Sequence, residues 1–365
     1  MREIASAELF VLVNELKHFE GKRLNNFYDL GNGFRLDFES NQSIFAKLTK
    51  TFNETKFKEQ AENATEFAIA VRKRIKGSRL ESIRQRGLDR LLILKFVGMD
   101  KHMLIFEMFA KGNLILTDQD LNIELVYRQR SMRDRQILVN KKYMFPQSTA
   151  LSLSEFDAEN LGNAIAEASK EEGTKAIAAI SKFVNIGPIY MEELLKESGI
   201  TPAAEASALA EAEDKLVGKL LQFREQIKSP QPTAYLSSGS IIDFSIIPLE
   251  KYAGYETKHF DTLNELLDAI YAKERITVDN EENKAKIEEI EKSIERQKKL
   301  AQEYKEKAKE YREIGNKIYE YMYALNELIK KVGKEKANIE NQKTEENIEV
   351  TRINRQNKTM RVVLP

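Results

Sequence analysis

The first 147 residues switch repeatedly between two hydrophobic periodicities. Apolar residues spaced three or four apart predict a helix at residues 6–18 and a second, strongly basic helix at 67–76 that ends before Gly77. Alternating or continuous apolar stretches predict strands in the same region. These strands are a hairpin at 27–38, then 43–48, 91–96, 103–109 and 113–117. The mixture predicts an α+β domain that closes at Pro146.

Residues 148–229 have a different character, because Ala, Glu and Lys dominate and short helical patterns alternate with turns. Gly187 lies at a hairpin, Pro188 lies in the first turn of the next helix, and Ser198-Gly199 ends that helix. This arrangement predicts a helix-hairpin-helix module inserted into, or appended to, the α+β domain. Residues 230–274 then return to a mixed pattern, with two short strands and a helix at 260–271.

A heptad-like repeat begins near residue 276. Apolar residues from Ile287 to Val332 follow one another in steps of three and four, which is typical of a coiled-coil seam. Gly315 occupies a seam position, so we expect the long helix to be interrupted there and followed by a shorter one. A small hairpin at 349–364 ends the chain abruptly, and we expect the chain to be a truncated protein. An unpaired seam of this kind predicts a homodimer through the coiled coil.

Composition excludes several classes of chemistry. The chain of 365 residues is 42% hydrophobic and 32% charged, which is typical of a folded, charge-rich soluble protein. It has no Cys, which excludes disulfides, cysteine-ligated zinc and cysteine nucleophiles, and its three His are too far apart for a local metal motif. No apolar run approaches the length of a membrane span and no secretory signal begins the chain. We therefore expect a cytoplasmic protein with no membrane contact, no metal and no cofactor.

Charge is unevenly distributed, although 58 Lys and Arg balance 58 Asp and Glu. Residues 72–95 hold nine basic residues against two acids, and residues 127–143 hold six against Asp134. Residues 151–215 carry five basic and thirteen acidic residues, a net charge of −8. Two basic clusters in one domain are what binding to a phosphate backbone requires. The alternative is that these residues only keep a helix face solvated.

The segment Gly87-Leu88-Asp89-Arg90 precedes a predicted strand. Gly87 permits a turn, and a charged pair at a strand start is costly to bury. One interpretation is a local ion pair or turn cap. The other is an Arg directed at a phosphate or base, with the Asp accepting from a base amino group or orienting the Arg. The sequence has no nucleophile-elbow, P-loop or dinucleotide-binding motif, so we expect no catalytic residues and no enzyme.

Several stretches, in the right order, resemble the NFACT family of ribosome quality-control factors. They are SAEL at 6–9, GKRLNNFYDL at 21–30, IRQRGLDR at 83–90, KGNLILTD at 111–118, VNKKY at 139–143 and HFDTLNELLD at 259–268. The resemblance implies an α+β NFACT-N domain similar in fold to formamidopyrimidine-DNA glycosylase, with a helix-hairpin-helix insert and a long coiled-coil arm. The implied parts are the first part of the NFACT-N domain (1–150), the helix-hairpin-helix domain (151–229), the second part of NFACT-N (230–274) and a truncated coiled-coil middle region (275–365).

The resemblance also implies a function. Members of the family bind a large ribosomal subunit still obstructed by peptidyl-tRNA, recruit tRNA, and support template-free C-terminal tailing or degradation of the stalled chain. The family's tRNA-recognition pair corresponds to Asp89 and Arg90, and a second functional carboxylate corresponds to Glu8, where the family usually has Asp. We expect Arg84 and Arg86 to contact tRNA beside this pair. The candidates for contacts with the RNA backbone are Arg79, Arg128, Arg130, Arg133 and Arg135.

Two other functions stay open. The glycosylases that the fold resembles begin with Pro followed by Glu and carry a cysteine zinc finger, whereas this chain begins Met1-Arg2-Glu3 and has no Cys. A glycosylase-like nucleic-acid-binding protein without retained catalysis is therefore the first alternative. The second is a pure interaction protein whose coiled coil is the working part, and it predicts no salt-sensitive RNA binding.

Overall fold

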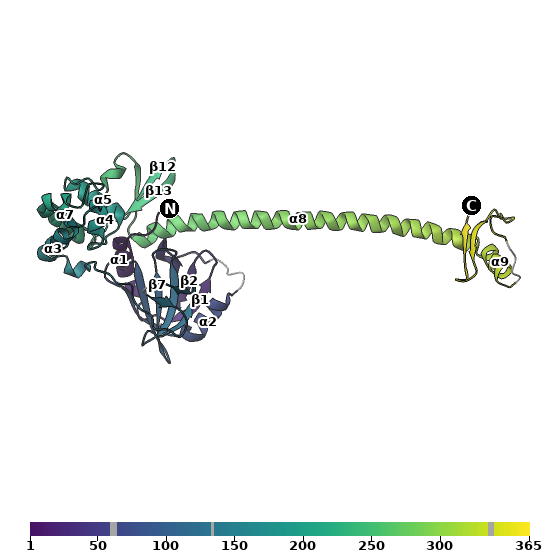
Figure 1. Cartoon of the computed structure of the whole chain (residues 1–365), viewed down its shortest axis with the longest axis horizontal. Coiled ribbons are helices and arrows are strands. Elements are labelled where there is room, and N and C mark those ends of the chain that lie inside the picture. The colour runs from purple at the N-terminus through teal and green to yellow at the C-terminus, as the bar shows by residue number, and fades with distance from the viewer. Residues whose placement is uncertain (59–63, 133–134, 335–338) are drawn as a thin grey trace. The chain divides into compact units, whose positions relative to one another are not determined.

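The computed structural model describes the backbone of residues 1–58, 64–132, 135–334 and 339–365, and the side chains of the same residues except 272–289. The chain forms two compact units, Met1–Ile276 and Thr277–Pro365, and each is described by itself (Figure 1). The boundaries that the sequence predicts after residues 150 and 229 both fall inside the first unit.

A helix and a four-stranded sheet begin the first unit. Helix α1 (Ser6–Glu15) follows the apolar spacing of its sequence and continues as a 3₁₀ turn (Leu16–Phe19). The antiparallel sheet has its strands in chain order: β1 (Leu24–Asp29), β2 (Phe34–Phe38), β3 (Ser43–Lys47) and β4 (Thr51–Thr55). The helix, the hairpin and the third strand form where the sequence predicts them. Strand β4 is absent from the prediction because Phe52 is its only large apolar residue.

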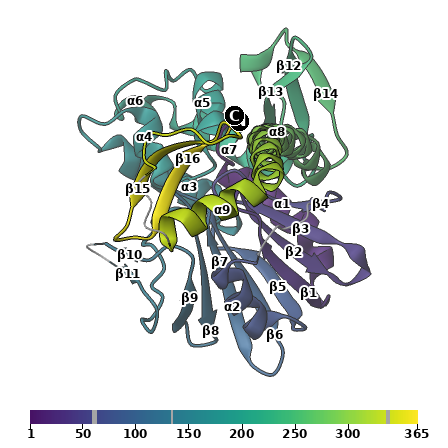
Figure 2. The same ribbon diagram turned by 90° about the vertical axis from the view of Figure 1, so that its right-hand side faces the viewer.

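A second antiparallel sheet completes the α+β core (Figure 2). Its five strands, in order, are β5 (Arg79–Gln85), β6 (Leu91–Val97), β7 (Lys101–Glu107), β8 (Asn113–Asp118) and β9 (Ile123–Val126). Helix α2 (Glu66–Ile75) contacts β1 and β9, and a small hairpin of β10 (Arg130–Ser131) and β11 (Gln136–Ile137) follows β9. The two sheets share one buried core, in which the rings of Phe52 and Phe106 lie 5.1 Å apart, edge to face.

Helices replace strands after residue 157. They are α3 (Ala158–Ser169), α4 (Ala176–Ser181), α5 (Pro188–Glu197), α6 (Ala208–Glu211) and α7 (Glu213–Gln226). Short helices are thus present where the sequence predicts them, while their designation as a helix-hairpin-helix domain stays a prediction. The hairpin before α5 packs on the first helix, because the Ala7 N–H donates to the Ile186 carbonyl at 3.2 Å.

A three-stranded sheet closes the first unit. Its strand order is β13 (Ser240–Ser245), β12 (Thr233–Ser237) and β14 (Glu256–His259). The first two strands agree with the sequence prediction. Strand β14 reads Glu-Thr-Lys-His and carries no apolar residue, so only its pairing with β12 identifies it.

Helix α8 (Leu263–Glu320) begins in the first unit and continues into the second, so the helix expected at 260–271 and the heptad segment form one element. The interruption expected at Gly315 is wrong, because the helix passes through that residue and ends before Tyr321. A glycine costs a helix interior only about 1 kcal/mol, which a long helix tolerates. Seam residues such as Tyr304 and Tyr311 are exposed, and the coiled coil and its dimer stay predictions.

The second unit ends in a small helix and a hairpin. Helix α9 (Met322–Gly333) packs on strands β15 (Glu349–Asn354) and β16 (Thr359–Val363) through a cluster centred on Leu328, Ile348 and Val350. The terminal hairpin forms where the sequence predicts it. In the described part of the chain, no helix combines the length and apolarity needed to cross a bilayer.

The close contact between Gly187 and the start of α1 leaves no room for a side chain at residue 187. Its φ is +108°, and a Cβ there would lie 2.5 Å from the Cβ of Ala5. We expect Gly187→Ala to lower the free energy of unfolding by about 3 kcal/mol, because it adds both backbone strain and overpacking.

A matched control is Gly218→Ala inside α7, where a Cβ meets nothing within 4 Å. This change should raise the free energy of unfolding by about 1 kcal/mol through helix propensity. Urea unfolding of both variants measures the two effects, and equal stabilities would contradict the packing described here.

Candidate nucleic-acid interface

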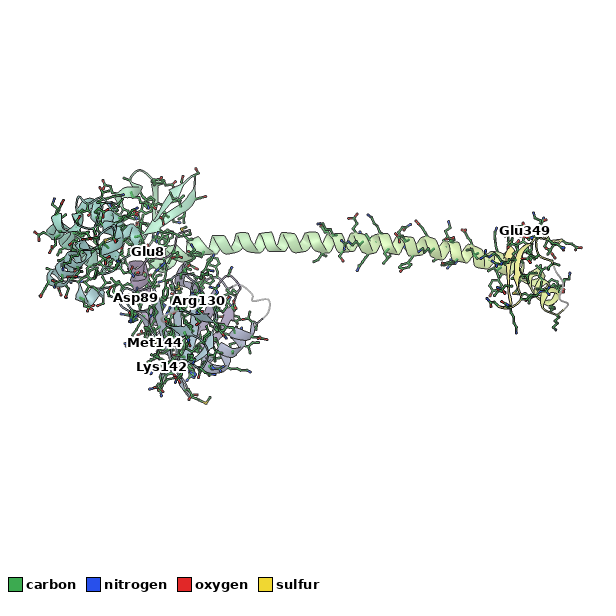
Figure 3. The ribbon with its side chains drawn as sticks, viewed as in Figure 1. Glu8, Asp89, Arg130, Lys142, Met144 and Glu349 are labelled. Carbon is green, nitrogen blue, oxygen red and sulfur yellow. The ribbon has the colours of Figure 1, made fainter. Side chains whose placement is uncertain are left out.

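Glu8 lies at the start of α1 (Figure 3), and its buried side chain is the centre of a polar network. Its side chain is 0% exposed, and its Oε2 accepts the Ala5 backbone N–H at 2.7 Å, which caps the helix. The guanidinium of Arg2 binds both carboxylate oxygens, with Nη1 2.9 Å from Oε2 and Nη2 against Oε1. The Tyr190 hydroxyl of α5 donates to Oε1 at 2.6 Å. A buried carboxylate needs such partners, because its charge is otherwise far too costly to desolvate.

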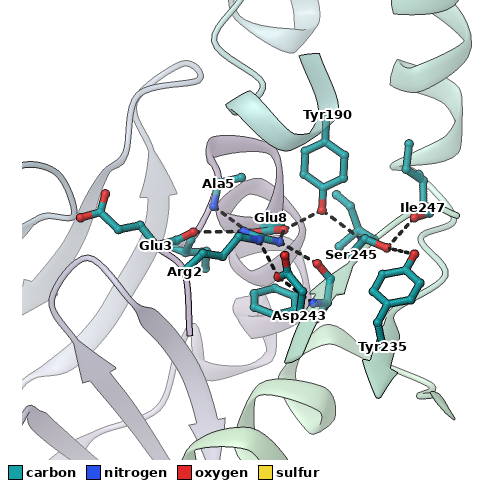
Figure 4. Close-up of polar contacts among 12 residues, drawn as sticks. Arg2, Glu3, Ala5, Glu8, Tyr190, Tyr235, Asp243, Ser245 and Ile247 are labelled. Carbon is teal, nitrogen blue, oxygen red and sulfur yellow. Dashed lines mark hydrogen bonds and ion pairs between the residues drawn. The ribbon is translucent and has the colours of Figure 1, made fainter. Parts of the chain in front are cut away.

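Arg2 carries the network into the sheet of β12, β13 and β14 (Figure 4). Its Nε donates to Asp243 Oδ1 at 2.8 Å, and its Nη2 donates to the Phe244 carbonyl at 2.7 Å. Asp243 also accepts from the Tyr252 hydroxyl, and the Ile246 N–H donates to the Tyr190 hydroxyl at 3.1 Å. One arginine therefore joins the N-terminal segment, the helices and the third sheet of the first unit.

The tyrosines of this network hold their protons strongly. Burial raises the pKa of Tyr190 well above its usual value, and the negative charge of Glu8 raises it further. Burial and the hydrogen bond to Asp243 raise the pKa of Tyr252 as well. Burial alone would lower the pKa of Arg2, but the carboxylate of Glu8 raises that pKa above its usual value. The network thus combines a charged arginine with neutral tyrosine donors.

Asp89 and Arg90 lie in the tight turn between β5 and β6. The Asp89 N–H donates to the Arg86 carbonyl at 2.9 Å, and Gly87 takes a φ of +52°, which places it in the left-handed region. Asp89 Oδ2 lies 3.3 Å from Arg86 Nη1, and Asp89 Oδ1 accepts from the Ser148 hydroxyl at 2.9 Å. The structure therefore pairs Asp89 with Arg86, and not with Arg90 as the sequence suggests.

Arg90 points to the N-terminal segment instead. Its Nη1 lies 2.5 Å from Glu3 Oε2 and 3.4 Å from the Ile4 carbonyl, and its side chain is 26% exposed. The Gln85 amide reinforces this contact, because its Nε2 donates to the carbonyls of Ser6 and Asp89. The segment that supplies Arg2 to the interior thus also holds the turn that carries Asp89 and Arg90.

The candidate arginines of β5 and its turn differ in exposure. Arg84 is exposed, and Arg79 is exposed with its guanidinium bound to the Gly21 carbonyl. Arg86 is half-buried, donates to the Pro146 carbonyl at 2.6 Å, and lies over the ring of Phe145. Arg84 and Arg86 lie at or next to the turn that carries Asp89 and Arg90, whereas Arg79 lies at the other end of β5.

The arginines of the second basic cluster, residues 127–143, also differ in exposure. Arg128 is exposed and donates to the Gly112 carbonyl, and Arg130 donates to the same carbonyl at 3.1 Å. Arg135 instead lies 2.8 Å from the buried carboxylate of Glu107, with only 11% of its side chain exposed. Arg133 lies outside the described residues.

Two expected contacts with RNA do not agree with these positions. Glu8 is sealed in the interior, and Arg135 neutralises a buried carboxylate, so neither side chain faces solvent. The reason is the same in both cases, because a buried charge is retained only where an opposite charge compensates it. The partners Arg2, Tyr190 and Asp243 escaped prediction. The one available signal was Asp243 among apolar residues of a predicted strand, which implies a buried partner.

The fold is shared with solved structures. A fibrinogen-binding protein from Staphylococcus aureus matches with a TM-score of 0.58 at 19% identity over 73% of this chain and 98% of that chain. The N-terminal part of the fibronectin/fibrinogen-binding protein of Streptococcus suis matches with the same TM-score, identity and coverage. Formamidopyrimidine-DNA glycosylase of Lactococcus lactis matches with a TM-score of 0.34, a likeness too low to carry a functional argument. The chain thus shares its α+β fold with these structures.

The chain belongs to the NFACT family, because the model of its N-terminal and middle domains matches residues 12–361. The archaeal Rqc2 homologue aRqcH of Methanocaldococcus jannaschii is 26% identical over 315 residues, which are 80% of this chain and 45% of that protein. The mouse ribosome quality control complex subunit NEMF is 31% identical over 207 residues, 53% of this chain and 19% of that protein. The chain therefore spans less than half the length of these relatives.

The stabilising effect of the Glu8 network can be tested by substitution. Replacing Glu8 with Gln keeps the shape but removes the main carboxylate partner of Arg2. We expect a loss of about 3 kcal/mol in the free energy of unfolding, since breaking a buried ion pair leaves a charge uncompensated. The control Glu81→Gln removes an exposed partner of Lys95 and should change little. Equal urea midpoints for the two variants would refute a stabilising role for this network.

The raised pKa of Tyr190 predicts that the free energy of unfolding falls at alkaline pH. The folded-state pKa of Tyr190 is raised, whereas in the unfolded chain a tyrosine ionises near pH 10. Its contribution to stability is therefore complete below pH 10 and is lost at higher pH, at about 1.4 kcal/mol per pH unit for each such tyrosine. Tyr190→Phe should be less stable at pH 8 but should lose stability less steeply between pH 10 and 11. Urea unfolding at several pH values measures the free energy of unfolding. The same dependence of that free energy on pH in the variant and in the wild type would contradict this prediction.

Proposed function

We propose that this chain is the tRNA-binding part of a ribosome quality-control factor. In this proposal it binds tRNA and the large ribosomal subunit obstructed by peptidyl-tRNA, and it supports template-free C-terminal tailing or degradation of stalled nascent chains in the cytoplasm. Curated relatives carry the name ribosome quality control complex subunit, which supports the role. The chain acts as a binding factor, with peptide transfer left to the ribosome.

The turn between β5 and β6 is the observation that carries the proposal. Asp89 can accept from a base amino group, and Arg90 can donate to a base edge or phosphate. Arg86, placed over Phe145, adds a flat cationic surface beside them. An acceptor and guanidinium groups in one tight turn, with the ring of Phe145 packed against the turn, are suited to bases in a single-stranded loop, which is the part of an RNA that proteins read by sequence.

The ion pair between Arg90 and Glu3 does not block such a contact. Glu3 is 42% exposed, and an exposed pair of this kind contributes only about 0–1 kcal/mol. A phosphate or base can therefore replace the carboxylate at little cost. In the free protein, Glu3 keeps the guanidinium in place beside the N-terminal segment.

Backbone contacts fall to the arginines that face solvent. Arg79 and Arg84 lie on β5, Arg128 follows β9, and Arg130 is the first residue of β10. In this proposal Arg135 keeps its structural pair with Glu107. Each phosphate neutralised releases counterions, so binding should weaken steeply as salt rises.

Binding of bulk tRNA to the double variant Asp89→Ala, Arg90→Ala tests this site. We expect affinity to fall at least about tenfold, because recognition of a base edge contributes about 1–3 kcal/mol and the phosphate contact is also lost. Titrations at two salt concentrations measure it, with circular dichroism to confirm that the variant folds.

The matched control is Glu3→Gln, which removes the competing carboxylate from the same guanidinium. This variant should bind tRNA as tightly as the wild type or more tightly. Equal affinity of the wild type and the folded double variant would reject Asp89 and Arg90 as the site.

A further inference from the structure

A second basic site lies beside the turn that carries Asp89 and Arg90. An open cavity of about 630 Å³ is enclosed by α1 with its 3₁₀ turn, by β5, by residues 152–154 and by the end of α7. Four cationic side chains from three separate segments line it, namely Lys17, Arg84, Arg224 and Lys228. Of the described residues that line the cavity, none is Asp or Glu. Such a convergence of cations in a concave site favours an anion.

Three nearby carboxylates do not outnumber the four cations of the cavity. Glu20 accepts the Ile83 N–H at 3.0 Å, and Glu155 accepts the Ser152 N–H at 2.7 Å. Glu225 lies beside the cavity and pairs with Lys228 at 2.7 Å and with Arg224 at 2.9 Å, and these cations lower its pKa. The glutamate is 54% exposed, so both pairs are weak and screened. Lys17 and Arg84 are exposed on the opposite wall. The net charge at the cavity therefore stays positive.

Gln85 supplies an unused hydrogen-bond acceptor at the same place. Its Nε2 donates to the carbonyls of Ser6 and Asp89, at 3.0 and 2.9 Å, which fixes the orientation of the amide. Its Oε1 is buried and has no partner among the described residues, although Gln85 lines the cavity. Because this oxygen is buried, a ligand with an O–H or N–H donor reaches it only when the Gln85 side chain shifts toward the cavity, and such a contact would satisfy the acceptor.

The remaining lining is apolar or hydroxylic. Phe10, Val13 and Leu153 provide apolar surface, and Ser152 and Ser154 provide hydroxyl groups. A nucleotide satisfies every part of this lining, because it combines a phosphate, hydroxyl and amino donors and a flat apolar base. Gly87 lines the cavity too, and it belongs to the turn that carries Asp89.

We propose that this cavity binds a nucleotide of the RNA, as a second contact that lies beside the Asp89 turn and, apart from Arg84, uses side chains that the first contact does not use. Lys17, Arg84, Arg224 and Lys228 hold the phosphodiester, and the base lies on the apolar lining. The inference rests on the proposed function, since the RNA is the same tRNA that Asp89 and Arg90 contact. A single strand that passes Gly87 reaches both sites.

The test compares the double variant Lys17→Ala, Lys228→Ala with the wild type in binding labelled bulk tRNA over a salt series. We expect affinity to fall about tenfold and the slope of log K against log salt to become shallower by about one to two. The matched control is Lys196→Ala, Lys215→Ala, two exposed lysines of α5 and α7 that do not line the cavity. This control should bind as the wild type does.

The outcomes separate this inference from the proposed function. Loss in the cavity variant with an unaffected control supports the inference, whether or not Asp89→Ala, Arg90→Ala also loses binding. An unaffected cavity variant overturns it, even when the Asp89 variant loses binding and the proposed function stands. A wild type that binds no tRNA overturns both. Labelled ATP bound in the cavity, with tRNA affinity unchanged by the variant, would assign the site to free nucleotides and overturn the RNA contact.

Discussion

The first unit depends on one buried ion pair, between Arg2 and Glu8. A carboxylate with no exposed surface is tolerable only when an opposite charge and further donors surround it, and Arg2, Ala5 and Tyr190 supply them. Arg2 can reach this carboxylate only if the N-terminal segment runs along the start of α1. The same guanidinium binds Asp243, so the pair joins parts of the chain that are more than 230 residues apart.

This constraint extends to the surface. Because Arg2 holds the N-terminal segment in place, Glu3 and Ile4 lie where they contact Arg90, and Ser6 lies where it accepts from Gln85. The N-terminal segment, which Arg2 anchors in the interior, thus holds the turn that carries Asp89. A site assembled on a tight turn needs such support, since side chains that bind RNA must keep their geometry. The interior network and the proposed interface therefore depend on the same N-terminal segment.

The sequence predicts the fold where apolar residues repeat regularly. Strands β6 and β8 have long apolar runs and form as expected, whereas β5 has only Leu80 and Ile83 among polar residues. Strand β14 has no apolar residue at all and exists only through its pairing with β12. Such strands follow from tertiary pairing, which a local pattern cannot reveal.

The same distinction between local and tertiary signals applies to the residues of the candidate site. The Asp89–Arg90 turn is accessible to prediction because Gly87 and a charged pair stand together in the sequence. The buried position of Glu8 is not, because Arg2, Tyr190 and Asp243 come from three distant segments. The arginines show why residue type alone misleads, since Arg128 is exposed and Arg135 neutralises Glu107. Only the arginines of a basic cluster that are not paired with a buried carboxylate are available to RNA.

Cross-linking of tRNA to the whole chain tests the central claim most directly. A tRNA carrying 4-thiouridine is irradiated in complex with the protein, and the cross-linked peptides are identified by mass spectrometry. We predict cross-links in peptides that contain the turn of residues 86–90 and the segment around Arg128. Cross-links confined to the second unit, residues 277–365, would contradict it.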